Sequence, residues 1–338
     1  MMTEYTPKNL LVTGGAGFIG ANFIHYFLKQ YPNANIINLD LLTYAGNLDH
    51  LKSLENNARY EFIHGDIADE KLVADSLRKF AIDTIVHFAA ESHVDRSITG
   101  PRAFVETNVL GTFNLLEQAR VYWLEEKKYT HKDCRFHHIS TDEVYGTLQM
   151  GDAAFTETTA YQPNSPYSAS KAGSDHLARA YFHTYQLPMT MSNCSNNYGP
   201  YQHPEKLIPT IIRCCIKGET IPIYGNGTNI RDWLYVDDHC QAIDTIIRTG
   251  ELGENYNVGG KNEIANLELT ETICQLFDER YPAKAPHKNL IEFVTDRPGH
   301  DFRYAIDNSK IQKELKWQPA YGFHEAINKT IDYYLKIF

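Results

Sequence analysis

The sequence contains no segment with the length and composition of a membrane span. No run of about 18 apolar residues occurs in its 338 residues, and a transmembrane helix needs roughly that many. The first residues, Met-Met-Thr-Glu-Tyr, also lack the charged segment and apolar core of a secretory leader. We therefore expect a soluble, cytoplasmic protein that does not act in a membrane.

Paired cysteines and the common metal-binding spacings are also absent. The six cysteines include no Cys-x-x-Cys pair, and the 15 histidines include no His-Glu-x-x-His spacing. Neither a zinc site nor a disulfide framework is therefore indicated. We expect reduced, mostly buried thiols and no metal.

Basic residues are in the minority. There are 32 Lys and Arg against 42 Asp and Glu, which gives a formal net charge of −10. Binding to nucleic acid or to anionic membranes needs clustered Lys and Arg, so we expect neither. The 43% hydrophobic and 22% charged residues are typical of a soluble globular protein.

Strand-like and helical patterns alternate along the first 195 residues. Apolar runs at 8–13, 35–39, 60–64, 84–88, 135–140 and 189–193 are separated by helical patterns near 18–31, 70–80, 103–126 and 167–185. This alternation predicts an α/β fold with a doubly wound parallel sheet.

Beyond residue 195 the pattern changes to short strands and helices, with strand-like runs at 221–224, 233–236, 255–258 and 290–294. No Gly/Ser-rich linker and no internal repeat separates the two parts. We expect a dinucleotide-binding domain at 1–195 and a smaller C-terminal α/β lobe at 196–338, packed closely and with interleaved segments.

A glycine-rich turn follows the first predicted strand. Gly15-x-Gly17-x-x-Gly20, preceded by Gly14, lies between a strand and a helix. Such glycines allow a tight turn and a close approach of backbone N–H groups to a pyrophosphate at the helix N-terminus. Asp40 ends the next strand and suits the ribose hydroxyls, which favours NAD over NADP. The fold is therefore expected to be Rossmann-type.

Other polar motifs fall where predicted strands end. Asp66-Ile67, Ala89-Ala90, Thr141-Asp142-Glu143 and Ser195-Asn196 each follow a strand, and ligands of open α/β sheets bind at that edge. Asp66 is placed to reach the adenine amino group. The small Ala89 and Ala90 leave space for the cofactor.

Tyr167 and Lys171 lie four residues apart, on one face of a predicted helix. A nearby ammonium favours the phenolate form, so Tyr167 is a candidate base toward a sugar hydroxyl. Thr141, at the end of its strand, is placed to hydrogen-bond the same hydroxyl.

The neighbouring Asp142 and Glu143 have two interpretations. They could form a solvated acidic turn, or they could act on two adjacent atoms of one sugar ring. An elimination needs one group to remove a proton and another to protonate the departing hydroxyl. Oxidation at carbon 4 of a hexose acidifies the hydrogen on carbon 5, which makes loss of the 6-hydroxyl as water feasible.

These motifs resemble the extended branch of the short-chain dehydrogenase/reductase superfamily and, within it, the dTDP-glucose 4,6-dehydratases. The resemblance covers essentially the whole chain. It is carried by TGGAGFIG (13–20), DLLTYAGN (40–47), HFAAESHVDRSI (87–98), STDEVYG (140–146), YSASK (167–171), NCSNNYGPYQHPEKLIP (193–209), RDWLYVDDH (231–239) and RPGHDFRYAID (297–307).

The resemblance implies a hydro-lyase that oxidises carbon 4 of dTDP-glucose, eliminates water across carbons 5 and 6 and returns the hydride to carbon 6. Asp142 would be the general acid and Glu143 the base at carbon 5, while Thr141, Tyr167 and Lys171 serve the oxidation. NAD would be tightly bound and regenerated in each turnover. The helices at 103–126 and 167–185 would form a homodimer interface.

The resemblance also implies two sets of binding residues. The NAD-binding set is Gly14, Gly17, Phe18, Ile19, Gly20, Asp40, Leu41, Thr43, Asp66, Ile67, Ala89, Ala90, Ser92, Thr107, Tyr167, Lys171 and Asn196. The substrate-binding set is Ser92, Thr141, Asp142, Glu143, Asn196, Lys206, Leu207, Pro222, Tyr224, Arg231, Asn266, Arg297 and His300.

Three alternatives stay open on the sequence alone. The first is a UDP-glucose 4,6-dehydratase, since such enzymes carry the same acidic pair. The second is a nucleotide-sugar 4-epimerase, which needs no acid–base pair. The third is a non-catalytic NAD-binding sensor or scaffold.

Overall fold

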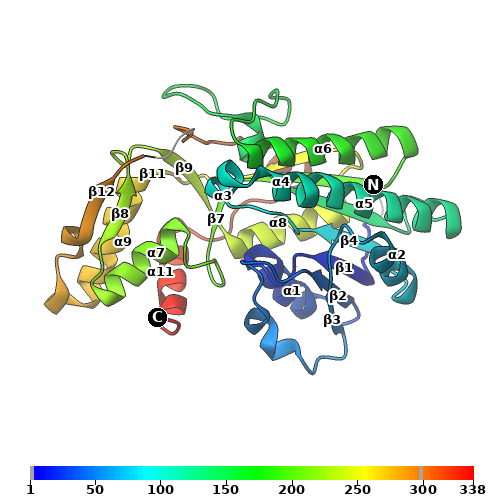
Figure 1. The fold of residues 1–338 in the computed structure, drawn as a ribbon, viewed down its shortest axis with the longest axis horizontal. Coiled ribbons are helices and arrows are strands. Elements are labelled where there is room, and N and C mark those ends of the chain that lie inside the picture. Colours follow the sequence, from blue (N-terminus) through cyan, green and yellow to red (C-terminus); the bar gives the residue numbers. More distant parts are fainter. Residues whose placement is uncertain (1–3, 297–299) are drawn as a thin grey trace.

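A computed structural model describes residues 4–296 and 300–338. Its centre is a seven-stranded sheet in the order β10-β6-β5-β4-β1-β2-β3, with every neighbouring pair parallel (Figure 1). The strands are β1 (Asn9–Thr13), β2 (Asn35–Asp40), β3 (Tyr60–His64), β4 (Thr84–His87), β5 (Arg135–Thr141), β6 (Met189–Cys194) and β10 (Asn255–Val258). The predicted doubly wound, Rossmann-type sheet is confirmed.

Helices cover both faces of this sheet, as the nearly continuous apolar runs of its strands require. Leu10 and Val12 of β1 join one buried cluster with Phe23 of α1 (Phe18–Gln30) and with α8 (Val236–Thr249). Leu11, between them, joins the cluster on the opposite face with α2 (Glu70–Lys79), α5 (Thr112–Ala119) and α6 (Pro166–Tyr185). Alternate residues of one strand thus serve two cores.

The helix predicted at 103–126 forms, but it is not uniformly α-helical. It runs from α4 (Pro101–Phe104) through a π-helical segment, Val105–Gly111, then α5, and then a second π-helical segment, Arg120–Glu126. A short helix, α3 (Val94–Thr99), precedes it. Wider π turns are often found at functional sites.

The C-terminal part forms a smaller α/β lobe beside the carboxyl edge of the sheet (Figure 1). One small sheet has the order β11-β9-β7, and β8 pairs with β12 in another. The elements are β7 (Asn196–Tyr198), α7 (Leu207–Lys217), β8 (Ile221–Tyr224), β9 (Ile230–Tyr235), β11 (Glu263–Ala265), α9 (Asn266–Arg280), β12 (Ile291–Val294), α10 (Ser309–Leu315) and α11 (Phe323–Tyr334).

The two parts share a core and exchange segments. The 255–258 strand, assigned from sequence to the C-terminal lobe, is β10 and pairs with β6 at the edge of the central sheet. One hydrophobic cluster extends from Leu10 in β1 to Ile331 in α11. The division at residue 195 stays a prediction.

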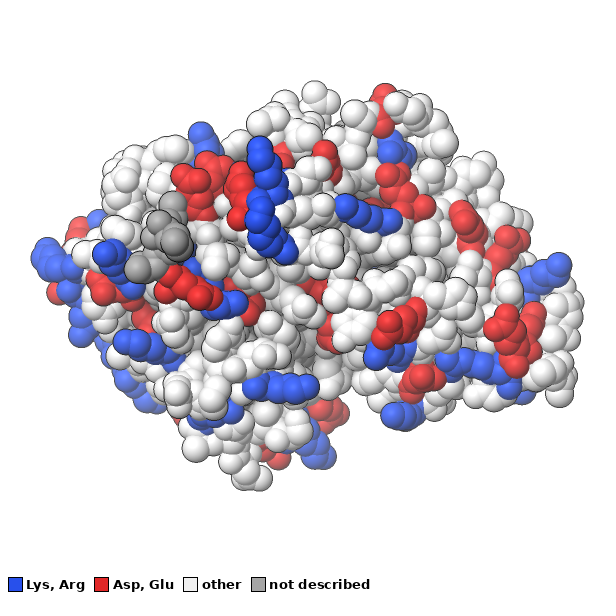
Figure 2. Space-filling view, turned by 180° about the vertical axis from the view of Figure 1, so that it is seen from behind, with Lys and Arg blue, Asp and Glu red and all other residues white. Residues whose placement is uncertain are grey.

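Short 3₁₀ helices complete the chain: η1 (Leu48–Leu54), η4 (Asp142–Tyr145), η5 (Pro282–Lys284) and η6 (His287–Leu290). None of the helices in the described residues is long and apolar enough to cross a membrane. All six cysteines are buried free thiols, as predicted. Figure 2 shows acidic and basic side chains interspersed over the face in view.

Candidate active site

The glycine-rich turn between β1 and α1 has the geometry of an anion cradle. Gly14 has a φ of +69°, and a Cβ there would lie 2.6 Å from the backbone nitrogen of Ala89. A Cβ on Gly20 would lie 2.4 Å from the Gly14 carbonyl oxygen. Gly17, the N-cap of α1, makes no side-chain cap, so the helix N-terminus is not covered by its own cap and can take a phosphate.

Asp40 ties this turn to the end of β2. Its carboxylate accepts hydrogen bonds from the backbone N–H groups of Ala16 (2.9 Å) and Leu42 (2.8 Å). Burial raises the pKa of Asp40, and the two backbone donors oppose the rise. A carboxylate offers about four acceptor positions, so Asp40 can hold the turn and still accept from a ribose hydroxyl.

The other candidate cofactor residues lie along the same edge of the sheet. Thr13 pairs with Leu39 and His87, and Thr141 pairs with Cys194, so these strands end side by side. Phe18 and Ile19 open α1, and the remaining positions follow the strand ends or lie on neighbouring helices: Leu41, Thr43, Asp66, Ile67, Ala89, Ala90, Ser92, Thr107 and Asn196.

The start of α6 carries Tyr167 and Lys171. Ser165 caps this helix in a reciprocal arrangement with Ser168, and Pro166 occupies the first turn. Both features favour a helix start at this point. Lys171 is buried, and its ammonium donates to the Ile139 carbonyl oxygen of β5 at 2.7 Å.

The surroundings of Tyr167 strongly shift the pKa of its hydroxyl. Burial raises its pKa well above the ordinary value, the charges of Glu143 and Cys194 add to the rise, and a hydrogen bond from Thr141 opposes it. The Lys171 ammonium, one turn further along α6, donates to the β5 backbone. The lowering of the Tyr167 pKa by the Lys171 ammonium, which the sequence suggests, stays a prediction.

Asp142 and Glu143 begin the 3₁₀ turn η4 that follows β5 directly. The Thr141 hydroxyl accepts from the Glu143 N–H at 3.3 Å and donates to Asp142 Oδ1 at 3.4 Å. Asp142 Oδ2 is buried and has no hydrogen-bond partner among residues 4–296 and 300–338. Burial, then the Glu143 and Asp232 charges, raise the Asp142 pKa far above its ordinary value. These effects favour the protonated form of Asp142.

Arg231 of β9 lies close enough to this turn for its charge to act on Asp142. Its guanidinium donates to the backbone oxygens of Asp301 (2.9 Å) and Ile230 (2.7 Å) and stacks 4.4 Å from the Tyr304 ring. These contacts fix its position at the boundary between the sheet and the C-terminal lobe.

The other candidate substrate residues are spread over the C-terminal lobe. Lys206 and Leu207 begin α7, Pro222 and Tyr224 are exposed on β8, and Asn266 begins α9. The Asn266 Oδ1 is buried without a partner in the described part of the chain. His300 contacts Asp296 at 2.7 Å, and Arg297 lies outside the described residues.

A sheet edge with a dinucleotide cradle, followed by a Thr, Tyr and Lys set at the ends of β5 and α6, defines a protein of the extended short-chain dehydrogenase/reductase class. A family model for GDP-mannose 4,6-dehydratase matches residues 11–330. The dTDP-glucose 4,6-dehydratase of Xanthomonas campestris pv. campestris (strain B100) is 55% identical over 96% of this chain and 92% of that protein. The chain belongs to this family of sugar-nucleotide 4,6-dehydratases.

Solved structures agree with this assignment. The dTDP-glucose 4,6-dehydratase of Bacillus anthracis str. Ames, in complex with NAD, has a TM-score of 0.87 and 46% identity, and covers 97% of each chain. The dTDP-glucose 4,6-dehydratase of Streptomyces venezuelae, with NAD and TYD bound, has a TM-score of 0.88 and 45% identity, also over 97% of each chain.

Proposed function

We propose that this protein is a dTDP-glucose 4,6-dehydratase, which converts dTDP-D-glucose to dTDP-4-keto-6-deoxy-D-glucose and water. The observation that carries this proposal is the placement of the buried Asp142 next to Glu143, directly after Thr141 and close enough to Tyr167 for both charges to act on it. A dehydrogenase needs only Thr141, Tyr167 and Lys171. The adjacent carboxyl pair adds the elimination.

NAD is the proposed cofactor, and the residues present fit it. The glycine cradle leaves no space for side chains at Gly14 and Gly20, and Asp40, which is bonded to this turn, is assigned to the ribose hydroxyls. The curated relatives are dTDP-glucose 4,6-dehydratases, and two solved relatives hold NAD. When bound, NAD supplies the oxidation at sugar carbon 4 and the later reduction at carbon 6.

In the oxidation half, Tyr167 takes the proton of the sugar 4-hydroxyl. Thr141 shares that hydroxyl by a hydrogen bond, which its position at the end of β5 allows. Lys171 is fixed by its bond to the Ile139 oxygen, and we assign it the positioning of the nicotinamide ribose.

In the elimination half, the two carboxyl groups act on neighbouring atoms. The 4-ketone acidifies the hydrogen on carbon 5, and Glu143 removes it. Asp142 gives its proton to the departing 6-hydroxyl, which leaves as water. Because burial favours the protonated Asp142, the acid is ready before the substrate reacts.

The nucleotide and sugar are proposed to contact the residues around the end of β5 and in the C-terminal lobe: Ser92, Asn196, Lys206, Leu207, Pro222, Tyr224, Arg231, Asn266, Arg297 and His300. Arg231 suits the pyrophosphate, since guanidinium groups bind phosphate bidentately. We place the enzyme in the cytoplasm, where six free buried thiols stay reduced, and in deoxysugar biosynthesis.

We further propose a homodimer through the helices at 101–126 and 166–185. Large apolar side chains are exposed there: Val105 (50%), Leu110 (54%), Phe113 (42%) and Tyr185 (46%). Exposed large apolar side chains on these helices are consistent with a protein interface. Light scattering of the protein and of Leu110→Glu tests this, because the substitution should shift the mass from dimer to monomer.

The test of the activity is to incubate the purified protein with dTDP-glucose deuterated at carbon 4 and to analyse the product by mass spectrometry. We expect a dehydrated 4-keto product with deuterium at carbon 6. A product of unchanged mass would exclude dehydration and favour the epimerase alternative. UDP-glucose run in parallel separates the two nucleotides, and activity that survives Tyr167→Phe would point to the scaffold alternative.

A further inference from the structure

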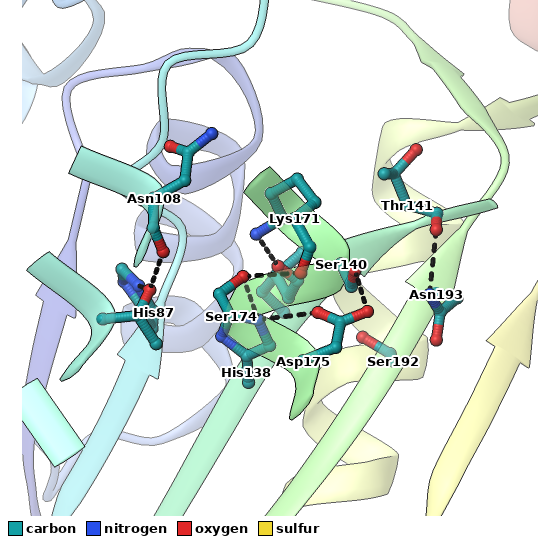
Figure 3. A network of polar contacts seen from close by, with 12 residues as sticks. His87, Asn108, His138, Ser140, Thr141, Lys171, Ser174, Asp175, Ser192 and Asn193 are labelled. Atoms are coloured by element: carbon teal, nitrogen blue, oxygen red, sulfur yellow. Dashed lines mark hydrogen bonds and ion pairs between the residues drawn. The ribbon is translucent and has the colours of Figure 1, made fainter. Parts of the chain in front are cut away.

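A second buried carboxylate, Asp175, lies beneath the candidate active site (Figure 3). It follows Lys171 by four residues and Tyr167 by eight on α6, so all three share one face of that helix. Asp175 is only 1% exposed. The oxidation and elimination steps described above do not use it.

Three side chains donate to the Asp175 carboxylate. His138 Nε2 lies 3.0 Å from Oδ1, while the Ser140 hydroxyl (2.7 Å) and the Tyr161 hydroxyl (3.0 Å) donate to Oδ2. His138 and Ser140 are alternate residues of β5 and so face the same side of the sheet.

These bonds join α6 to the end of β5. Lys171 donates to the carbonyl oxygen of Ile139, the residue between His138 and Ser140 (Figure 3). The Ser174 hydroxyl also lies 3.3 Å from His138 Nε2, so three consecutive residues before Thr141 are attached to three side chains of α6. A slip of either element would break several of these bonds at once.

Asp175 also provides a negative charge for the buried Lys171. Burial lowers the pKa of Lys171, and the Asp175 charge opposes that fall. For Asp175 itself, burial raises the pKa, but the His138 hydrogen bond, the Lys171 charge and the Ser140 hydroxyl hold it below its ordinary value. Asp175 is therefore ionised at neutral pH, and His138 Nε2 carries the proton that it donates.

The other titratable groups around Lys171 and Asp175 favour their neutral forms. His87 of β4 and His138 of β5 have pKa values lowered mainly by burial. Burial raises the pKa of Cys194 on β6 to about 12, and it also raises the pKa values of Tyr145 in η4 and of Tyr161 before α6. Of the two groups that oppose the fall in the Lys171 pKa, Asp175 has the larger effect and Cys194 the smaller one.

We propose that Asp175 is a positioning residue for the reaction: it holds α6 and β5 in the register that brings Tyr167 to Thr141, and it balances the charge of the Lys171 ammonium. This inference rests on the proposed dehydratase activity. The inference goes beyond the proposed activity, because it predicts that a residue without substrate contact affects kcat and the pH dependence of kcat.

The test compares Asp175→Asn, which keeps the size and removes the charge, with the wild-type enzyme. We expect kcat to fall by about 10- to 100-fold, less than the loss expected for a general acid or base, with KM for dTDP-glucose within about threefold. With the negative charge gone, Lys171 should lose its proton at lower pH. The alkaline limb of the kcat profile should therefore shift downward by about one pH unit, as expected for loss of a close opposite charge.

Asp244→Asn is the matched control. Asp244 is also a buried helical aspartate that accepts from two tyrosines, Tyr26 and Tyr31, but it lies on α8. The Asp244→Asn variant should have the kcat of the wild-type enzyme and the same pH profile of kcat. If Asp175→Asn does not fold, the double variant Ser140→Ala/Tyr161→Phe keeps the charge and removes two donors. It should lower kcat while leaving the alkaline limb in place.

The outcomes separate the two proposals. If the wild-type enzyme does not dehydrate dTDP-glucose, the proposed function fails. If the wild type is active and Asp175→Asn has the wild-type kcat and alkaline limb, the inference about Asp175 is wrong. An unchanged kcat in the double variant would likewise contradict the register role.

Discussion

Asp142 and Asp175 are equally buried, each 1% exposed, and yet their pKa values are shifted in opposite directions. Asp142 has one oxygen without a partner in the described residues and a weak contact at the other. Asp175 Oδ1 accepts a hydrogen bond from His138, and Oδ2 accepts two, from Ser140 and Tyr161. The pKa is raised in the first case and lowered in the second.

Burial alone therefore does not determine the charge of a carboxyl group in this enzyme. Desolvation raises both pKa values, and the supply of hydrogen-bond donors and of a nearby cation decides the net direction. Asp142 lies in the turn just beyond β5, where few donors reach it. Asp175 lies against the body of the strand, where polar residues face it. The carboxyl group that we propose as the general acid, Asp142, is the one with few donors.

The largest effect is expected from Asp142→Asn, which removes the proton donor of the elimination. Loss of a general acid or base costs about 100- to 10,000-fold in rate, so dehydration of dTDP-glucose should fall by that factor. Glu143 and Tyr167 remain, so the carbon 5 hydrogen should still exchange with solvent. Mass spectrometry in D₂O should then show deuterium uptake into the sugar without loss of water.

Glu143→Gln is the paired control for that result. It should abolish the deuterium uptake and the water loss together, because the base at carbon 5 is gone. Water loss at the wild-type rate in Asp142→Asn would remove Asp142 from the mechanism.

Features with a local sequence pattern were predictable. The Gly14–Gly20 turn, the end of β2 at Asp40 and the Tyr167–Lys171 spacing each depend on a few neighbouring residues. The alternation of strands and helices likewise predicted the parallel sheet. The acidic pair after Thr141 was found because it directly follows a strand.

Features that depend on distant pairing were not predictable. Nothing in residues 255–258 indicates that they pair with β6 rather than with a strand of their own lobe. The π-helical turns at Val105–Gly111 could not be predicted either, because the sequence pattern used to find helices assumes 3.6 residues per turn. Asp175 had a weak signal: β5 is buried throughout although it contains His137, His138 and Ser140, and a buried polar strand needs partners.

The second largest effect concerns stability. Asp175→Ala leaves His138, Ser140 and Tyr161 without their acceptor and Lys171 without its balancing charge, so we expect a loss of about 3–5 kcal/mol in the free energy of unfolding at pH 7. Urea denaturation followed by circular dichroism measures it. A loss below about 1 kcal/mol would show that the network contributes little.

The pH dependence of stability should separate the two aspartates more sharply. The folded-state pKa of Asp175 is lowered, so its contribution is present above the unfolded-state value of about 3.9 and is lost as the pH falls through the folded value. The folded-state pKa of Asp142 is raised, so it destabilises the fold progressively as the pH rises above about 4.

Asp142→Asn should therefore stabilise the inactive protein at pH 8 and have little effect at pH 4, because the cost of ionising the buried Asp142 is present only at the higher pH. Urea denaturation at the two pH values measures the difference. Equal stability of the variant and the wild type at both values would show that Asp142 is ionised in the folded enzyme.

The smallest effect is expected from Ser140→Ala, which removes one of the three donors to Asp175. A single hydrogen bond to a charged group contributes about 1.5–3 kcal/mol at most, and the bonds from His138 and Tyr161 remain, so we expect a loss near 1 kcal/mol. If the network acts as a unit, the Ser140→Ala/Tyr161→Phe variant should lose more than the sum of the two single variants. A double-mutant cycle measures this coupling. If the losses of the two single variants simply add, each donor stabilises Asp175 independently, and the hydrogen bonds do not act together to hold β5 against α6.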